Sequence, residues 1–129
     1  MAASKSSLSA GEIIYAVLTK NPEVSKLAGD IYPVVEDRAD LPYIVYRRIG
    51  LEQTPVKSQR GSDSVAIEIL CFTKGYTEGV RLAEAVRGAL DGMQMSHEDL
   101  TIRACTLTDS EETWYDDAYV QQLIFNCKM

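Results

Sequence analysis

The sequence lacks the features that mark membrane and secreted proteins. Its 129 residues contain no apolar run that approaches the ~20 residues of a membrane-spanning helix. Near the N-terminus, Lys5 is followed by serines and not by the continuous apolar segment of a secretory signal. We therefore expect a protein that is made in the cytoplasm and has no membrane partner.

Histidine and cysteine are also scarce, which argues against catalysis and metal binding. Cys71, Cys105 and Cys127 lack the paired spacing of a structural zinc site. Each lies in a segment that favours a strand, so we expect buried, reduced thiols. The single histidine, His97, lies in a polar loop among carboxylates, where a solvated side chain is the usual outcome. Glycine motifs for phosphates or dinucleotides are missing as well. We predict no enzyme activity, no catalytic residue, no cofactor and no metal.

Basic residues are outnumbered by acidic ones, 13 to 19, which gives a net charge of −6. Lysine and arginine supply most of the affinity of proteins for nucleic acid. The balance therefore argues against specific nucleic-acid binding. One stretch departs from it, because Arg47, Arg48, Lys57 and Arg60 lie close together in the sequence and could form a basic patch.

An acidic run surrounds the only tryptophan. Residues 111–117 hold four carboxylates together with Trp114 and Tyr115. Their spacing matches no calcium loop, so we interpret the run as a solvated connection between two strands. Exposed aromatic side chains are enriched at interface hot spots, whereas a buried one would close the end of the core. Both interpretations of this aromatic pair remain open.

The composition and the helix signals indicate one folded domain. The apolar fraction is 46% and the charged fraction is 25%, which is average for a globular protein. We predict a flexible N-terminus over residues 1–8 and a single α+β domain over residues 9–129. The domain begins with a helix at Ser9, where Glu12 completes a capping box and Leu8 with Ile13 would form a hydrophobic staple.

Further elements follow from periodicity and from breaking residues. Asn21 and Pro22 end the first helix and can begin a short second one. A longer helix is predicted over 76–90, with Gly92 as its left-handed stop. Alternation and β-branched residues predict strands over 31–35, 43–49, 64–72, 100–107 and 118–127. The intervening segments 50–63, 93–99 and 109–117 are predicted to be loops or connections.

These elements predict an antiparallel sheet of about four strands with two main helices packed on one face. A monomeric sheet of this kind should have a polar outer face. Here the second face carries Leu70 and Phe72 on one strand and Val120 and Ile124 on another. We interpret this face as an interface with other protein subunits. The alternative is that the 50–63 segment folds over it.

Several segments resemble the tail-completion (tail-terminator) family of long-tailed bacteriophages and prophages. The similarity begins with Asp30-Ile31-Tyr32-Pro33 and Leu41-Pro42-Tyr43-Ile44-Val45-Tyr46. It continues through residues 67–76 and 82–90 and ends with Tyr115-Asp116-Asp117 before the last strand. The resemblance implies a virion structural protein that forms a ring, commonly a hexamer, at the head-proximal end of the tail tube. It also implies the tube protein and the head–tail connector proteins as partners.

Two other functions remain open at this point. A head–tail connector or neck adaptor shares the size and class of this chain. A small ligand-binding α+β module would use a face of the sheet as its pocket, with Tyr43, Tyr46, Arg48 and Glu68 as candidate polar groups. The residues that we predict at a subunit or partner interface are Leu70, Phe72, Arg47, Arg48, Lys57, Arg60, Trp114, Tyr115, Val120 and Ile124.

Overall fold

The computed structural model describes residues 6–34, 40–56 and 59–129, without the side chains of residues 54–62. A short 3-10 turn, η1 (Ser7–Ser9), leads into the first helix. The helices are α1 (Ala10–Lys20), α2 (Pro22–Leu27) and α3 (Tyr76–Leu90). The strands are β1 (Asp30–Pro33), β2 (Tyr43–Val56), β3 (Gln59–Thr73), β4 (Met95–His97), β5 (Leu100–Ile102), β6 (Ala104–Tyr115) and β7 (Ala118–Lys128).

The main sheet has five strands in the order β1-β2-β3-β7-β6, and β4 pairs with β5 in a separate small hairpin. The pairs β2–β3, β3–β7 and β6–β7 are antiparallel, whereas β1 runs parallel to β2. The α+β class is confirmed, but the prediction of about four antiparallel strands was wrong in detail. The pairing direction of the four-residue β1 could not be read from its composition, because alternation carries no information on direction.

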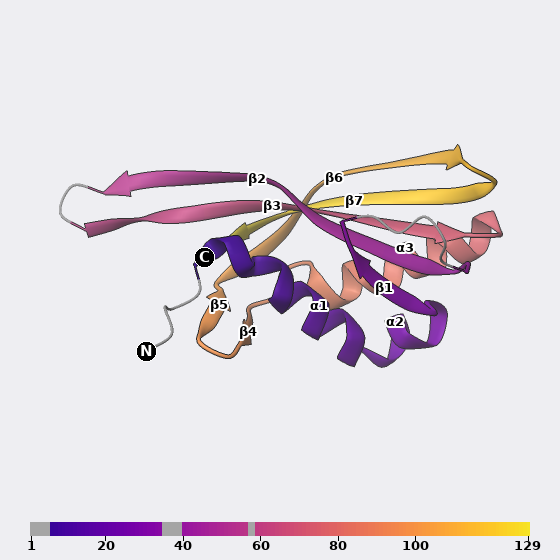
Figure 1. The fold of residues 1–129 in the computed structure, drawn as a ribbon, viewed down its shortest axis with the longest axis horizontal. Helices are drawn as coiled ribbons and strands as arrows, with labels where there is room; N and C mark the ends of the chain where they lie inside the picture. The colour runs from indigo at the N-terminus through magenta and orange to yellow at the C-terminus, as the bar shows by residue number, and fades with distance from the viewer. Residues whose placement is uncertain (1–5, 35–39, 57–58) are drawn as a thin grey trace.

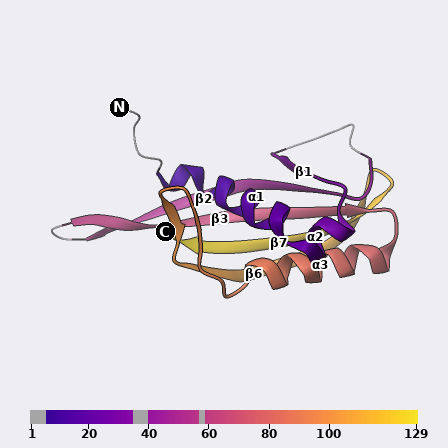
Figure 2. The same ribbon diagram turned by 90° about the horizontal axis from the view of Figure 1, so that it is seen from below.

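All three helices and the β4–β5 hairpin lie on the same side of the main sheet (Figures 1 and 2). Apolar side chains of α1 and α3 pack against alternate residues of β2, β3 and β7, which all point to this side. The largest fully buried side chains of this core are Ile13, Ile14, Leu18, Ile44, Ile67, Ile69, Leu82, Leu90, Ile102 and Phe125. We refer to this side as the inner face of the sheet.

The start of the first helix differs from the sequence prediction. Ser9 makes no side-chain capping bond, because it lies within a helical turn instead of in the extended conformation that a cap requires. The cap lies three residues earlier, where the Oγ atom of Ser6 accepts a hydrogen bond from the backbone N–H of Leu8. The side chain of Leu8 is exposed, so the predicted staple with Ile13 is wrong too.

The signals for the other two helices are confirmed. The Asn21 side chain accepts hydrogen bonds from the N–H groups of Glu23 and Val24 and thereby caps α2. The α3 helix has the predicted bounds, and Gly92 follows it with a φ of +76°. Glycine adopts this left-handed conformation without the steric cost that a Cβ atom brings.

The predicted loop over 50–63 was wrong, because β2 and β3 continue through most of it as a long hairpin. Pro55 misled the prediction, since proline is disfavoured in a central strand. It lies beside a register shift between Thr54 and Val56, in a part of β2 that has only β3 as a neighbour among the described strands. An edge position with a bulge tolerates the missing N–H group.

Three further segments were assigned wrongly from sequence. The acidic segment 109–117 belongs mainly to β6, and only Asp116 and Asp117 form the turn before β7. Both turn residues have positive φ, 51° and 61°, as in the two-residue turns that match the twist of a hairpin. The predicted strand over 100–107 is divided at Arg103 into β5 and β6, and β4 occupies part of the predicted 93–99 loop.

The three cysteines are buried in strands, as predicted. Burial raises the pKa of the Cys71 thiol to about 12. The sulfur atoms of Cys105 and Cys127 face each other across β6 and β7 at 3.8 Å and are not bonded. The hydrogen bond with Cys127 and, next to it, burial raise the pKa of the Cys105 thiol, which disfavours the reactive thiolate.

Candidate functional site

The face of the main sheet opposite the helices carries the largest group of predicted interface residues. Successive side chains of a strand point to opposite faces, so residues that alternate with the core positions lie on this side. We call it the outer face. Its central members come from four strands and lie next to one another in register: Tyr32, Tyr43, Val45, Arg47, Glu68, Leu70, Phe72, Val120, Gln122 and Ile124. On β6, Glu111 and Thr113 pair with Gln122 and Val120 and extend this face at its edge.

The outer face is apolar along much of its length. The rings of Tyr43 and Phe72 are stacked with their centroids 4.7 Å apart, and Tyr32 meets Tyr43 edge-on at 6.0 Å. Val45 and Val120 are only 3% and 5% exposed, although neither belongs to the core under the helices. Neighbouring side chains of the twisted sheet therefore form a second, thinner apolar layer.

A charged network crosses this apolar layer. The Glu68 side chain is 7% exposed and accepts a hydrogen bond of 2.7 Å from Nε of Arg47. Its second oxygen accepts one of 2.6 Å from the Gln122 amide. Both carboxylate oxygens thus have partners, which offsets the cost of removing the charge from water. Because the donors come from β2 and β7, the network ties three strands together and leaves the Arg47 side chain 50% exposed.

None of the described helices or strands lies over the outer face (Figures 1 and 2). The β2–β3 hairpin, which the alternative interpretation placed over it, instead extends away from the body of the molecule (Figure 1). Leu70, Phe72 and Ile124 remain partly accessible. The sheet therefore presents a partly apolar surface without a cover from the described parts of the chain.

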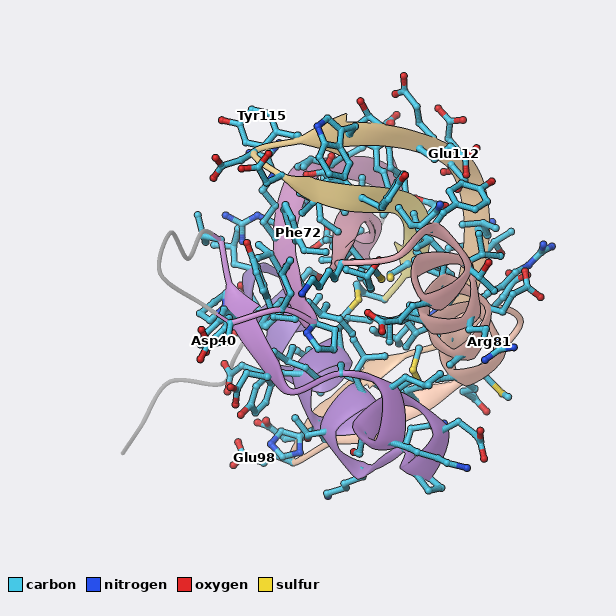
Figure 3. All side chains as sticks on the ribbon, turned by 90° about the vertical axis from the view of Figure 1, so that its right-hand side faces the viewer. Asp40, Phe72, Arg81, Glu98, Glu112 and Tyr115 are labelled. Atoms are coloured by element: carbon cyan, nitrogen blue, oxygen red, sulfur yellow. The ribbon has the colours of Figure 1, made fainter. Side chains whose placement is uncertain are left out.

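A second group of predicted residues lies at the turn between β6 and β7. Trp114 packs edge-on against Tyr119, with ring centroids 4.8 Å apart, and Tyr119 in turn meets Tyr76 of α3 at 5.8 Å. Tyr115 follows Trp114 in the strand and is 69% exposed. Figure 3 shows Tyr115 on the side of the hairpin away from α3 and Glu112 on the side near it. The structure therefore separates the two aromatic residues that the sequence placed side by side.

The predicted basic patch is divided in the structure. Arg47 belongs to the outer face, whereas the neighbouring Arg48 donates a hydrogen bond of 2.8 Å to the backbone carbonyl of Leu8. Lys57 lies outside the described residues. Arg60 is the second residue of β3, close to the tip of the long hairpin. The two arginines that are adjacent in sequence thus have different structural roles.

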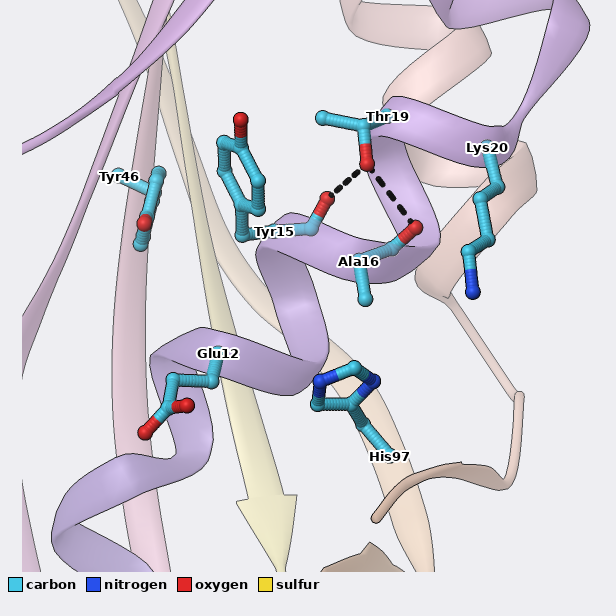
Figure 4. A pocket seen from close by; sticks show the side chains of 7 residues that line it. All are labelled: Glu12, Tyr15, Ala16, Thr19, Lys20, Tyr46 and His97. Atoms are coloured by element: carbon cyan, nitrogen blue, oxygen red, sulfur yellow. Dashed lines mark hydrogen bonds between the residues drawn. The ribbon is translucent and has the colours of Figure 1, made fainter.

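The molecule also has a cavity of about 330 Å³ beside α1 (Figure 4). His97 lines it together with Glu12 and Tyr46, and the Tyr15 ring lies 5.9 Å from that of Tyr46. Figure 4 shows the imidazole of His97 next to the helix and the hydroxyl of Thr19 turned to backbone carbonyls. The Thr19 hydroxyl donates to those carbonyls, so it is not activated by the histidine as a nucleophile would be.

Within the described residues, no group of three or more histidine, cysteine, aspartate or glutamate side chains is placed to hold a metal ion. No helix in the described part of the chain has the length and apolar character that crossing a membrane requires.

Sequence reasoning missed several polar residues of these surfaces. Gln122 was not considered, and Glu68 was considered only as a polar group of a ligand pocket. A signal for its role was present, since Glu68 shares its strand face with Leu70 and Phe72 and a carboxylate on an apolar face needs hydrogen-bond partners. Tyr76 and Glu112 were missed because their contact joins residues 36 positions apart.

Comparisons with known proteins agree with this architecture. The model of the family described as tail completion protein gp17 matches residues 12–128. A solved chain from the virion of a native gene transfer agent particle superposes with a TM-score of 0.80. The match covers 95% of this chain and 98% of that one at 17% sequence identity, so it establishes a shared fold. A search of curated proteins found no match.

Proposed function

This chain belongs to the tail completion protein gp17 family and is a structural subunit of a phage-type virion tail, in which we propose that it forms a closed ring. The ring would end the tail tube at its head-proximal side and join it to the head. The resemblance noted in the sequence suggests a hexamer. The observation that carries the proposal is the partly apolar outer face, which no described helix or strand of the chain covers.

The physical argument begins with the size and chemistry of that face. Contiguous apolar surface of this kind on a soluble domain usually marks a protein interface. A charge network set in an apolar surface adds specificity, because a wrong partner would leave buried polar groups without hydrogen bonds. The Arg47–Glu68–Gln122 network is suited to that role. We propose that Leu70, Phe72, Val120 and Ile124 contact a neighbouring subunit or the tube around it.

The proposed role requires no catalysis. His97 lines an open cavity with Glu12, and the hydroxyl beside it is bonded to backbone. We propose that the cavity has a structural or docking role. Substitution His97→Ala should leave assembly and attachment to tubes unchanged. A chemical turnover that is lost in this variant would contradict the non-enzymatic proposal.

The ring is tested by measuring the mass of the purified chain in solution over a range of concentrations, followed by electron microscopy. We expect a discrete species several times heavier than the 14.3-kDa chain, or its appearance when purified tail tubes are added. A protein that stays monomeric at high concentration and does not bind to tail tubes would overturn the proposal. Binding to portal-containing heads but not to tubes would identify a neck adaptor instead.

A further inference from the structure

A pocket of about 210 Å³ lies at the end of the molecule where β6 turns into β7. Its walls come from elements that are distant in sequence, because Tyr76 belongs to α3, Trp114 to β6 and Tyr119 to β7. Tyr76 and Trp114 are 48% and 55% exposed. Three aromatic rings thus surround an accessible hollow instead of closing the core, which leaves their surface available to a ligand.

The polar group of this pocket is the Glu112 carboxylate. The Tyr76 hydroxyl lies 3.0 Å from both of its oxygens and donates to them, and the Gln121 amide donates to one at 2.8 Å. The hydrogen bond from Tyr76 to this carboxylate raises the pKa of the tyrosine. These contacts fix the carboxylate in place without neutralising its charge. The pocket therefore presents a positioned negative charge between aromatic rings.

This combination fits a cationic side chain. The faces of tryptophan and tyrosine attract an ammonium or guanidinium group, and the attraction grows when water is excluded. A guanidinium can stack on a ring and bind a carboxylate at the same time, since it is planar and carries several donors. No basic residue occurs between Leu107 and Tyr119. The cation must therefore come from outside this hairpin.

The distribution of charge along the molecule points to a second copy as its source. The β6–β7 turn, beside which the aromatic pocket lies, is at one end of the long axis, and the β2–β3 hairpin extends from the other end (Figure 1). The sequence near the tip of that hairpin carries Lys57 and Arg60, whereas its acidic residues Glu52 and Asp63 lie farther from the tip. Copies related by rotation in a ring meet through two different surfaces, so one end can contact the other. An isolated two-stranded hairpin is only marginally stable, so docking would also stabilise it.

We propose that the aromatic pocket receives a cationic side chain from the β2–β3 hairpin of a neighbouring copy of this chain. The inference rests on the proposed ring. It assigns the ring contact to Glu112 and Trp114 at one end and to the hairpin at the other. The Arg47 and Arg48 side chains, which lie earlier in β2, are hydrogen-bonded within their own chain, so we assign the cation to Lys57 or Arg60 among the basic residues of the β2–β3 hairpin.

Trp114 makes the test direct, because it is the only tryptophan in the chain. Its fluorescence and its quenching by acrylamide are measured for the full chain at concentrations below and above assembly, with mass recorded in parallel. We expect Trp114 to become several-fold less accessible to acrylamide on assembly. Assembled rings in which Trp114 is quenched as readily as in the monomer would overturn the inference and leave the proposed ring intact. If no assembly occurs at all, both fail.

Matched variants identify the two sides of the contact. Substitution Glu112→Gln keeps the shape of the pocket and removes its charge, and we expect assembly to weaken by about tenfold. The control Glu84→Gln removes the same charge from the exposed side of α3 and should change nothing. The double variant Lys57→Gln/Arg60→Gln should weaken assembly as Glu112→Gln does. Shielding of Trp114 that persists in this double variant would exclude the hairpin as the occupant.

Discussion

The inner and outer faces of the main sheet are built from the same strands but differ in how far their side chains are buried. On the inner face, alternate residues of β3 and β7 such as Ile67 and Phe125 are fully buried under the helices. On the outer face, Leu70 and Phe72 are only partly buried, and a charge network lies among them. One strand therefore supplies both a closed core and an open apolar surface.

The difference indicates that stability and assembly are assigned to separate faces. A closed, mainly apolar core supplies folding free energy through burial and packing. A partly exposed apolar layer contributes less to the monomer and keeps surface available for a partner. The hydrogen bonds of the Glu68 network require a defined geometry, unlike the apolar contacts of Ile67 and Ile69 on the inner face of β3. Substitutions on the two faces should accordingly have different consequences.

The largest difference is expected between two phenylalanines. Phe125 is fully buried on the inner face, so Phe125→Ala should cost about 3–5 kcal/mol of unfolding free energy. Phe72 is partly buried on the outer face and stacks on Tyr43, so Phe72→Ala should cost about 1–2 kcal/mol. Urea unfolding of both variants measures these losses. Assembly of both variants is measured as well. We expect the Phe72→Ala protein to remain folded but to lose assembly.

Equal losses of stability from the two phenylalanine variants would contradict the division between the faces. So would normal assembly of the Phe72→Ala variant. An exposed position such as Thr101 serves as the control for both measurements, since Thr101→Ala removes little buried surface.

A smaller effect is expected at the polar network of the outer face. Glu68→Leu leaves Gln122 without its acceptor and exposes Arg47 to water, which should cost about 1–2 kcal/mol of stability. The outer face becomes more apolar at the same time, so we expect mixed aggregates in place of one discrete assembly. Glu68→Gln keeps the shape and is the matched control. Uniform rings from the Glu68→Leu variant, measured by mass and microscopy, would show that the network does not select the partner.

Much of the fold could be predicted from sequence because its signals are local. The 76–90 helix has a clear amphipathic pattern and a glycine stop, and the Asn21 cap lies beside the groups that it bonds. The alternation in β3 likewise identified both faces of the sheet. Candidate outer-face residues such as Leu70 and Val120 followed from that alternation, and they stay predictions as interface residues.

The rest depends on contacts between distant residues. The hairpin can continue past Pro55 because β3 is the one described strand that pairs with β2 there, and the sequence does not show which strand is at the edge. The pocket around Glu112 depends on α3 passing beside β6, which brings Tyr76 to it. The acidic run was assigned to a turn because charge indicates exposure and cannot distinguish an exposed strand from a loop.

The smallest effect is expected at the turn between β6 and β7, which belongs to neither face. Asp116 and Asp117 adopt positive φ, a conformation that costs most residues about 1 kcal/mol relative to glycine. Asp117→Gly should therefore stabilise the monomer by about 0.5–1 kcal/mol in urea unfolding. Thr113→Gly, in the strand of the same hairpin, is the matched control and should destabilise by a similar amount. Asp117 lies outside both apolar layers and does not line the aromatic pocket, so assembly of the Asp117→Gly variant should be unchanged. A variant that gains stability but loses assembly would extend the proposed subunit contact from the aromatic pocket to the turn.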